Sequence, residues 1–150
     1  MSSLDELRRE NSELRSRLAE LERALAEAAA HEQARSRVVS VVEASSEAIL
    51  STAMDGTILS WNPAAQRLFG FTAGEAVGRI DLEIVPFELL VEHQHAVERA
   101  LRGEAVMIET RRRRRDGTSI AVSVIYARLA DPTGKPLGIS TMSHASPRTS

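Results

Sequence analysis

Residues 55–70 read DGTILSWNPAAQRLFG, a stretch that encodes a turn, a strand and the start of a helix. Asp55-Gly56 is a strong hairpin signal because both residues tolerate the positive φ angles of a tight turn. Apolar runs flank this dipeptide, from Ala48 to Met54 and from Ile58 to Trp61. The sequence therefore predicts two paired antiparallel strands.

Helices are predicted after this hairpin. Asn62-Pro63 ends the second strand, since proline cannot donate to a strand ladder but fits the first turn of a helix that asparagine caps. Gly70 stops that helix, and Thr72 is suited to cap a further single turn. The longest helix of this region runs from about Glu88 to Arg102, where apolar residues recur at spacings of three and four.

Three strands close the region, separated by turn residues. They are Ala105 to Arg113, Ser119 to Ala130 and Leu137 to Ser143. In the middle strand Val122 and Val124 alternate with smaller residues, so one face of this strand is apolar and the other is mixed. This order of strands and helices indicates an α+β domain.

Three blocks of the sequence resemble the PAS family. They are DGTILSWNPAAQRLFGFTAGEAVGR at 55–79, RRRRRDGTSIAVSV at 111–124 and DPTGKPLGISTMS at 131–143. The blocks follow the family's order at about its spacing, and the resemblance covers Val42 to Ser143. It implies a PAS-like five-stranded antiparallel sheet with flanking helices, which sensors use as a ligand pocket, a dimer surface or both.

A seven-residue repeat of apolar positions begins at Leu4 and predicts a long N-terminal coiled-coil helix. The a and d positions, with the later positions that restore the repeat, are the predicted dimer contacts: Leu4, Leu7, Asn11, Leu14, Leu18, Leu21, Leu25, Ala28, Val39 and Val42. Asn11 at an a position can hydrogen-bond its twin across a two-stranded parallel axis. The sequence thus favours a parallel homodimer, and a single solvated helix is the alternative.

The charges beside the repeat agree with a parallel pair. In that arrangement a g position contacts the next e position of the other helix, so Glu10 meets Arg15. Arg17 meets Glu22 in the same way. Both contacts are attractive.

These patterns divide the chain into three parts. Residues 1–37 form the coiled-coil dimerisation helix, residues 38–143 the PAS domain with a flanking helix at 38–46, and residues 144–150 a disordered tail. PAS domains that feed a following effector commonly end in an Asp-Ile-Thr type motif, and this tail lacks it. We therefore expect that no effector follows and that a signal leaves through the coiled coil or through a bound protein.

Composition excludes several classes of function. A net charge of −2 gives no general attraction to nucleic acid or to an anionic membrane. The chain has no cysteine, which excludes disulfides, thiolate metal sites and the flavin–cysteinyl adducts of light-sensing PAS relatives. No apolar run approaches the ~20 residues that cross a bilayer, and the polar start is no signal peptide. We expect a cytoplasmic protein without a membrane partner.

A small-ligand sensor would need a pocket between the long helix and the sheet. The candidate lining residues are Ile58, Leu89, His93, Val97, Val122 and Val124. An interaction module would instead have this space filled by its own side chains. The low aromatic content is compatible with both.

His93 is the candidate ligand for a cofactor. In haem-binding PAS oxygen sensors the axial histidine lies on the corresponding long helix, with an arginine six residues later, here Arg99. The distal arginine of those sensors has no counterpart at Val106–Ile108, and a lone histidine on an amphipathic helix is more often structural. We expect no cofactor and no metal, and a haem-based gas or redox sensor is an alternative function.

The run from Arg111 to Arg115 is the strongest local charge. Side chains alternate between the faces of a strand, the run ends at a solvated turn, and no aromatic residues are interleaved for base stacking. We therefore expect no nucleic-acid partner, and a basic nucleic-acid site is the weakest alternative.

No catalytic constellation is recognisable. The sequence has no nucleophile beside a base, no paired carboxylates in an apolar setting and no phosphate-binding glycine loop. It therefore indicates a non-enzymatic signalling or scaffold module that dimerises through its coiled coil and binds a partner protein or a small ligand.

Overall fold

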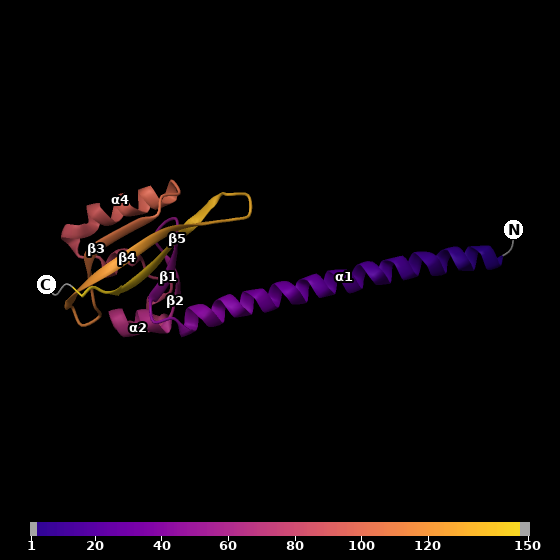
Figure 1. Cartoon of the computed structure of the whole chain (residues 1–150), viewed down its shortest axis with the longest axis horizontal. Coiled ribbons are helices and arrows are strands. Elements are labelled where there is room, and N and C mark those ends of the chain that lie inside the picture. The colour runs from indigo at the N-terminus through magenta and orange to yellow at the C-terminus, as the bar shows by residue number, and fades with distance from the viewer. Residues whose placement is uncertain (1–2, 148–150) are drawn as a thin grey trace. The chain divides into compact units, whose positions relative to one another are not determined.

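The computed structural model describes residues 3–147 of the chain (Figure 1). In chain order its elements are α1 (Ser3–Ala44), β1 (Ala48–Ala53), β2 (Ile58–Trp61), α2 (Pro63–Phe69), α3 (Ala73–Ala76), the 3₁₀ helices η1 (Asp81–Ile84) and η2 (Phe87–Leu89), α4 (Leu90–Leu101), β3 (Val106–Arg113), β4 (Ser119–Ala130) and β5 (Pro136–Ala145). The chain separates into two compact units between Val41 and Val42, and each unit is described by itself.

The N-terminal unit is one uninterrupted helix, α1, of 42 residues. Its alanine, leucine, glutamate and arginine residues favour helix, and no glycine or proline interrupts it. The six leucines of the predicted seam are all exposed, from 53% at Leu4 to 70% at Leu25. The predicted long helix is confirmed, and the predicted flanking helix at 38–46 is the last part of the same helix.

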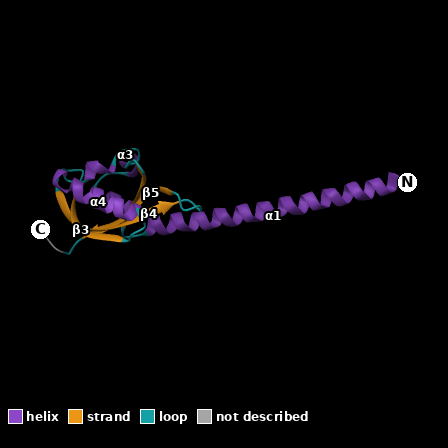
Figure 2. Ribbon diagram, turned by 90° about the horizontal axis from the view of Figure 1, so that it is seen from above, coloured by secondary structure: helices purple, strands orange, loops and turns teal. Residues whose placement is uncertain are grey.

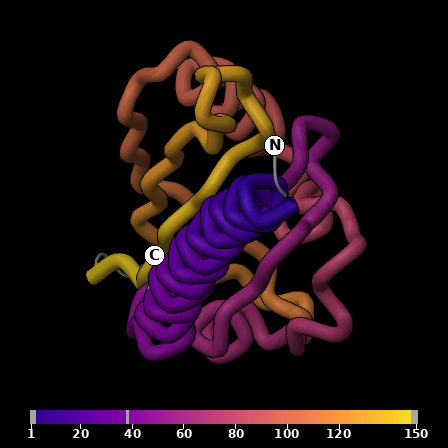
Figure 3. The backbone as a smooth tube through the Cα atoms, turned by 90° about the vertical axis from the view of Figure 1, so that its right-hand side faces the viewer, coloured from indigo at the N-terminus to yellow at the C-terminus, as the bar shows by residue number. Residues whose placement is uncertain are grey.

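The second unit is built on one antiparallel sheet of five strands in the order β2-β1-β5-β4-β3. The first and last strands of the chain lie side by side, with Leu50 opposite Thr141 (Figure 3). The predicted α+β fold with this sheet is confirmed. Strand β5 continues to Ala145, so His144 and Ala145, which we expected in the disordered tail, extend the sheet. Residues 148–150 of that tail lie outside the described residues.

The turn chemistry at the first hairpin follows from its sequence. The Asp55 carboxylate accepts a hydrogen bond from the Thr57 backbone N–H at 2.9 Å, and Gly56 adopts φ +89°, which an L side chain rarely takes. The Thr57 hydrogen bond also holds the pKa of Asp55 below its usual value. Asp116 and Asp131 accept from a threonine two residues later in the same way.

The short helices are capped as predicted. The Asn62 side chain accepts from the Ala65 N–H, and α2 ends at Gly70 in the left-handed region. Thr72 and Glu75 form a reciprocal capping box at α3. These local interactions let very short helices form between β2 and α4.

The connection from α2 to α4 covers one face of the sheet (Figure 2). One apolar cluster lies between β1, β2 and α2, and includes Leu50, Trp61 and Phe69. A second lies between α4 and strands β3 to β5, and includes Val106 and Val124. Between these two clusters the interior holds polar side chains.

Candidate functional site

The candidate site is a chain of four buried polar residues around His93. Asp81 comes from η1, His93 from α4, Arg112 from β3 and Tyr126 from β4. His93 Nδ1 lies 2.8 Å from Tyr126 Oη, and His93 Nε2 lies 3.1 Å from Asp81 Oδ2. Arg112 Nη2 donates to Tyr126 Oη at 2.6 Å. The chain therefore links four separate elements through the middle of the domain.

Hydrogen-bond chemistry sets the direction at both ends of this polar chain. Arg112 only donates, so Tyr126 Oη accepts from it. The Asp81 carboxylate accepts from His93 Nε2 at the other end. The phenol and the imidazole thus lie between a guanidinium and a carboxylate.

Burial shapes the electrostatics of the phenol in this chain. It raises the pKa of Tyr126 to about 12, although the nearby Arg112 charge lowers it. The Arg112 guanidinium also donates to the carbonyl of Arg111 at 2.9 Å. A buried cation is costly unless it is hydrogen-bonded, so Tyr126 and this carbonyl stabilise Arg112 at 4% exposure.

The space beside the polar chain is small. Leu50, Phe69, Val124 and Thr141 are among the residues that line an internal cavity of about 20 Å³ there. Such a cavity holds about one water, whereas small-molecule pockets begin at roughly 300 Å³. In the described residues the interior between α4 and the sheet is thus largely filled by side chains.

The candidate pocket residues do not converge on one cavity. Ile58 is buried in the first apolar cluster, and Leu89 packs against that cluster. Val122 and Val124 belong to the second cluster, against which Val97 packs. His93 lies at the polar chain and, with Val97, also lines a groove that opens on the surface beside the β1–β2 turn.

A haem does not fit the observed geometry of His93. An axial ligand needs a free imidazole nitrogen, and both His93 nitrogens are within hydrogen-bond distance of protein partners. The cavity next to the ring is about 20 Å³, far below the volume of a haem pocket. Arg99 pairs instead with Glu104 at 2.7 Å.

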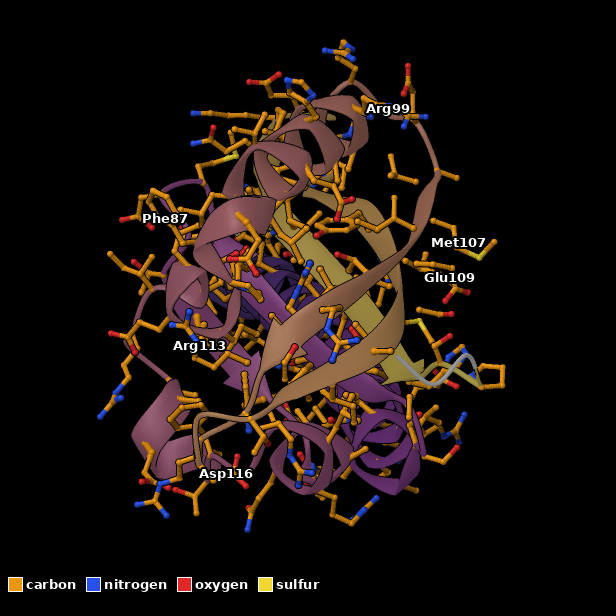
Figure 4. The ribbon with its side chains drawn as sticks, turned by 90° about the vertical axis from the view of Figure 1, so that its left-hand side faces the viewer. Phe87, Arg99, Met107, Glu109, Arg113 and Asp116 are labelled. Carbon is orange, nitrogen blue, oxygen red and sulfur yellow. The ribbon has the colours of Figure 1, made fainter. Side chains whose placement is uncertain are left out.

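The arginine run is divided between several environments. Arg112 is buried at 4% exposure, as the alternation of side chains between the two faces of a strand allows. Arg111 donates to Ser119, Arg115 pairs with Glu75 at 2.8 Å, and Arg113 is exposed. Figure 4 shows the edge strand β3 passing from Met107 through Arg113 toward the turn at Asp116. The run therefore forms no single basic surface.

The outer face of the sheet carries a row of apolar side chains. Met107 on β3 lies opposite Ile125 on β4, which lies opposite Met142 on β5. Met142 is in turn opposite Ile49 on β1. The exposed fractions are 73% for Met107, 40% for Ile125 and 37% for Met142. This outer row is solvent-exposed on β3, β4 and β5 and half-buried at Ile49 on β1.

Asp81, Arg112 and Tyr126 were not proposed as site residues from the sequence. For Arg112 and Tyr126 the sequence does indicate that the side chain faces inward. Arg112 shares its strand face with Val106 and Ile108, because it is an even number of residues from each. Tyr126 shares the inward face of Val122 and Val124, and a buried hydroxyl needs a hydrogen-bond partner. Nothing in the sequence pattern around Asp81 indicates burial, because only the folded path of the loop brings Asp81 next to His93.

Two negative findings apply to residues 3–147. This part of the chain contains no group of three or more histidine, aspartate or glutamate side chains arranged to hold a metal ion. No helix in it combines the length and apolar character needed to span a membrane.

The sheet order and the helical connection across one face define the chain's second unit as an α+β domain built on a five-stranded antiparallel sheet. The family profile of the PAS fold matches residues 42–145. Because this match covers more than half of the chain, the chain belongs to the PAS family. No curated protein matches the chain.

Solved structures show the same fold. The chain resembles the PAS domain of a protein from Colwellia psychrerythraea with a TM-score of 0.70 and 16% identity, over 74% of this chain and 95% of that one. The PAS domain of an HTR-like protein from Haloarcula marismortui gives a TM-score of 0.63 and 24% identity, over 80% of this chain and 98% of that one. A PAS domain from a two-component sensor histidine kinase gives a TM-score of 0.64 and 15% identity, over 77% of this chain and 99% of that one.

Proposed function

We propose that the chain is a non-enzymatic, homodimeric PAS signalling module that passes its signal to a partner protein. The observation that carries this proposal is the exposed leucine seam of α1. Leu14, Leu18 and Leu21 are each more than half exposed on this helix. Burying a leucine side chain contributes roughly 1.5–3 kcal/mol, so a partner helix would stabilise α1 strongly.

The charges beside the seam support a second copy of α1 as that helix, in parallel orientation. Glu10 then faces Arg15, and Arg17 faces Glu22. Asn11, the polar a position, is satisfied when its twin lies directly opposite. Parallel pairing would bring the two PAS domains to the same end of the assembly.

The interior of the PAS domain supports a role in protein interaction. The cavity next to the polar chain, of about 20 Å³, is too small for an internal organic ligand. The outer row of Met107, Ile125 and Met142 leaves apolar area exposed on the sheet. Exposed apolar patches of this kind mark interaction surfaces more often than catalytic sites.

Sedimentation equilibrium of the full chain tests the dimer. We compare the double variant Leu14→Glu/Leu18→Glu with the matched control Ser12→Glu/Ser16→Glu, which adds the same charge to the outer face of the helix. The seam variant should sediment as a monomer at tens of micromolar, and the control should remain a dimer. A monomeric unmodified chain, or a seam variant that dimerises as well as the control, would refute the proposal.

A further inference from the structure

A surface groove of about 320 Å³ lies where the β1–β2 turn meets α4. Its walls come from the turn residues 52–56, from η1, from one side of α4 and from Ile139 of β5. Small-molecule sites have volumes of roughly 300–1,000 Å³, so this groove can take a small organic molecule that the interior cannot. The groove shares no lining residue with the helical seam or with the outer row of the sheet.

Acidic side chains outnumber basic ones in the lining of this groove. Its ionisable lining groups are Asp55, Asp81, Glu98 and His93, and no lysine or arginine lines it. Glu98 forms no ion pair within residues 3–147. A cationic ligand group would therefore meet carboxylates without competition from a lysine or an arginine of the lining.

One oxygen of Asp81 gives the groove a defined recognition point. Asp81 is only 9% exposed, and its Oδ2 is bound by His93. Within the part of the chain that the structure describes, no hydrogen bond reaches the other oxygen, Oδ1. This oxygen is therefore open to a donor from a ligand, and a charge-assisted hydrogen bond to a carboxylate is stronger than one between neutral groups.

Gly56 keeps this oxygen accessible. A Cβ added at Gly56 would lie 2.9 Å from Asp81 Oδ1, so any other residue at this turn position would cover the oxygen. Gly56 itself lines the groove, as does Asp81. The unpartnered oxygen therefore faces the groove through the gap that the glycine leaves.

The remaining lining of the groove is apolar. Leu82 comes from η1 and Met54 from the β1–β2 turn, and Val97 and Leu101 come from successive turns of α4. Hydrocarbon buried against these side chains is removed from water, which favours binding. The site thus combines a carboxylate recognition point with an apolar wall.

We propose that this groove binds a small organic cation, a primary ammonium group on a short hydrocarbon body. The ammonium donates to Asp81 Oδ1, with Glu98 and Asp55 adding long-range attraction. The hydrocarbon lies along Val97 and Leu101. This binding activity goes beyond the signalling role proposed above and does not depend on dimerisation.

The probe is n-hexylammonium, with 1-hexanol and hexanoate as ligands of similar size and ammonium chloride as the cation alone. Binding to the full chain is followed by calorimetry and by ¹H–¹⁵N chemical shifts. Hexylammonium should bind at least about tenfold more tightly than 1-hexanol, hexanoate and free ammonium, and shifts should centre on Gly56, Leu82 and Val97. Equal affinity for hexanol, or shifts elsewhere, would overturn the proposal.

Two glycine variants separate this site from general effects on the fold. Gly56→Ala should weaken hexylammonium binding about tenfold or more, because the new methyl group covers Asp81 Oδ1. Gly117→Ala is the matched control, since it changes the glycine of a second Asp-Gly turn at φ +86° with nothing within 4 Å of the added Cβ. The backbone strain is shared, so equal effects of the two variants would contradict the proposal.

A milder pair of variants covers the case in which Gly56→Ala does not fold. Glu98→Gln removes one exposed groove carboxylate and should weaken hexylammonium binding about two- to fivefold at low salt. Glu88→Gln removes an exposed carboxylate that does not line the groove and should leave binding unchanged. Unchanged binding in Glu98→Gln would contradict the assigned charge recognition.

Discussion

Tyr126 is the only tyrosine of the chain and lies between His93 and Arg112 in the buried polar chain. Its pKa of about 12 in the folded state lies above the value of 10.0 for an exposed phenol. The folded state therefore favours the neutral phenol. The resulting contribution to stability is fully present below pH 10 and is lost as the pH rises toward 12.

The predicted alkaline titration can be read directly, because a single phenol gives a single phenolate absorbance. We expect a midpoint near 12 for the folded chain and near 10 in denaturant. The free energy of unfolding should fall by roughly 2–3 kcal/mol across that interval, since each pKa unit corresponds to about 1.36 kcal/mol.

The control for this titration is Tyr126→Phe, which keeps the ring and removes the titrating group. The variant should give no phenolate signal, and its loss of stability above pH 10 should be smaller, as followed by the fluorescence of the single Trp61. A folded-state midpoint at or below 10 would show that the phenol is not held in the buried chain.

At the scale of single residues, the role of a side chain was predicted correctly where that role depends only on neighbouring residues in the sequence. Asn62 and Thr72 were predicted as helix caps, and both cap as expected because a cap depends on the next three residues. The partners of His93 were missed, since Asp81 and Tyr126 meet it only after the loop and the sheet have formed. The direction of a side chain can be read from strand parity, but its partner on another element cannot.

At the scale of elements, Asn62 connects three segments that meet at the start of the domain. Its Oδ1 accepts from the backbone N–H groups of Ile49 and Ala65, each at 2.9 Å. Its Nδ2 donates to the carbonyls of Val42 and Glu47 at 3.0 and 2.9 Å. One buried side chain thus caps α2, holds β1 and satisfies a carbonyl at the end of α1.

Replacing Asn62 should therefore cost more than losing an ordinary cap. We expect Asn62→Ala to lower the free energy of unfolding by about 2–4 kcal/mol, because a lost cap costs about 1 kcal/mol and buried unpaired groups add roughly 1–3 kcal/mol. Urea unfolding followed by Trp61 fluorescence measures this change.

Thr72→Ala is the control for Asn62→Ala, since it removes an exposed cap and should cost only about 1 kcal/mol. A cost for Asn62→Ala no larger than that for Thr72→Ala would mean that the links to Val42 and Glu47 contribute nothing.

The elements themselves were largely predictable, because turn residues and alternation define them locally. Ser119–Ala130 was predicted with the observed bounds. The long helix was predicted to begin near Glu88, but the chain forms the 3₁₀ helix η2 before α4 begins at Leu90. This turn packs Leu89 against the first apolar cluster, a tertiary contact that helical periodicity does not encode.

At the scale of the whole molecule, the two units obtain their stability differently. The PAS domain buries apolar clusters on both sides of its polar chain, whereas α1 buries no leucine of its seam. Most helical stability in proteins comes from packing of an apolar face, so α1 depends on what covers that face. The surface groove also belongs to this scale, because turn, loop and helix create it together and no single segment of sequence predicts it.

Asn11 provides the sharpest test of how α1 is covered. In the proposed parallel dimer two Asn11 side chains face each other at an a position, where a polar pair costs stability but specifies register and the number of strands. Asn11→Val should therefore strengthen association, measured by sedimentation equilibrium, while larger assemblies appear beside the dimer. Raising the salt from 0.1 M to 1 M should weaken the dimer only slightly, because each exposed g–e pair contributes about 0.2–1 kcal/mol and the leucines dominate. Weaker association of Asn11→Val than of the unmodified chain would place Asn11 outside the seam and contradict the parallel register.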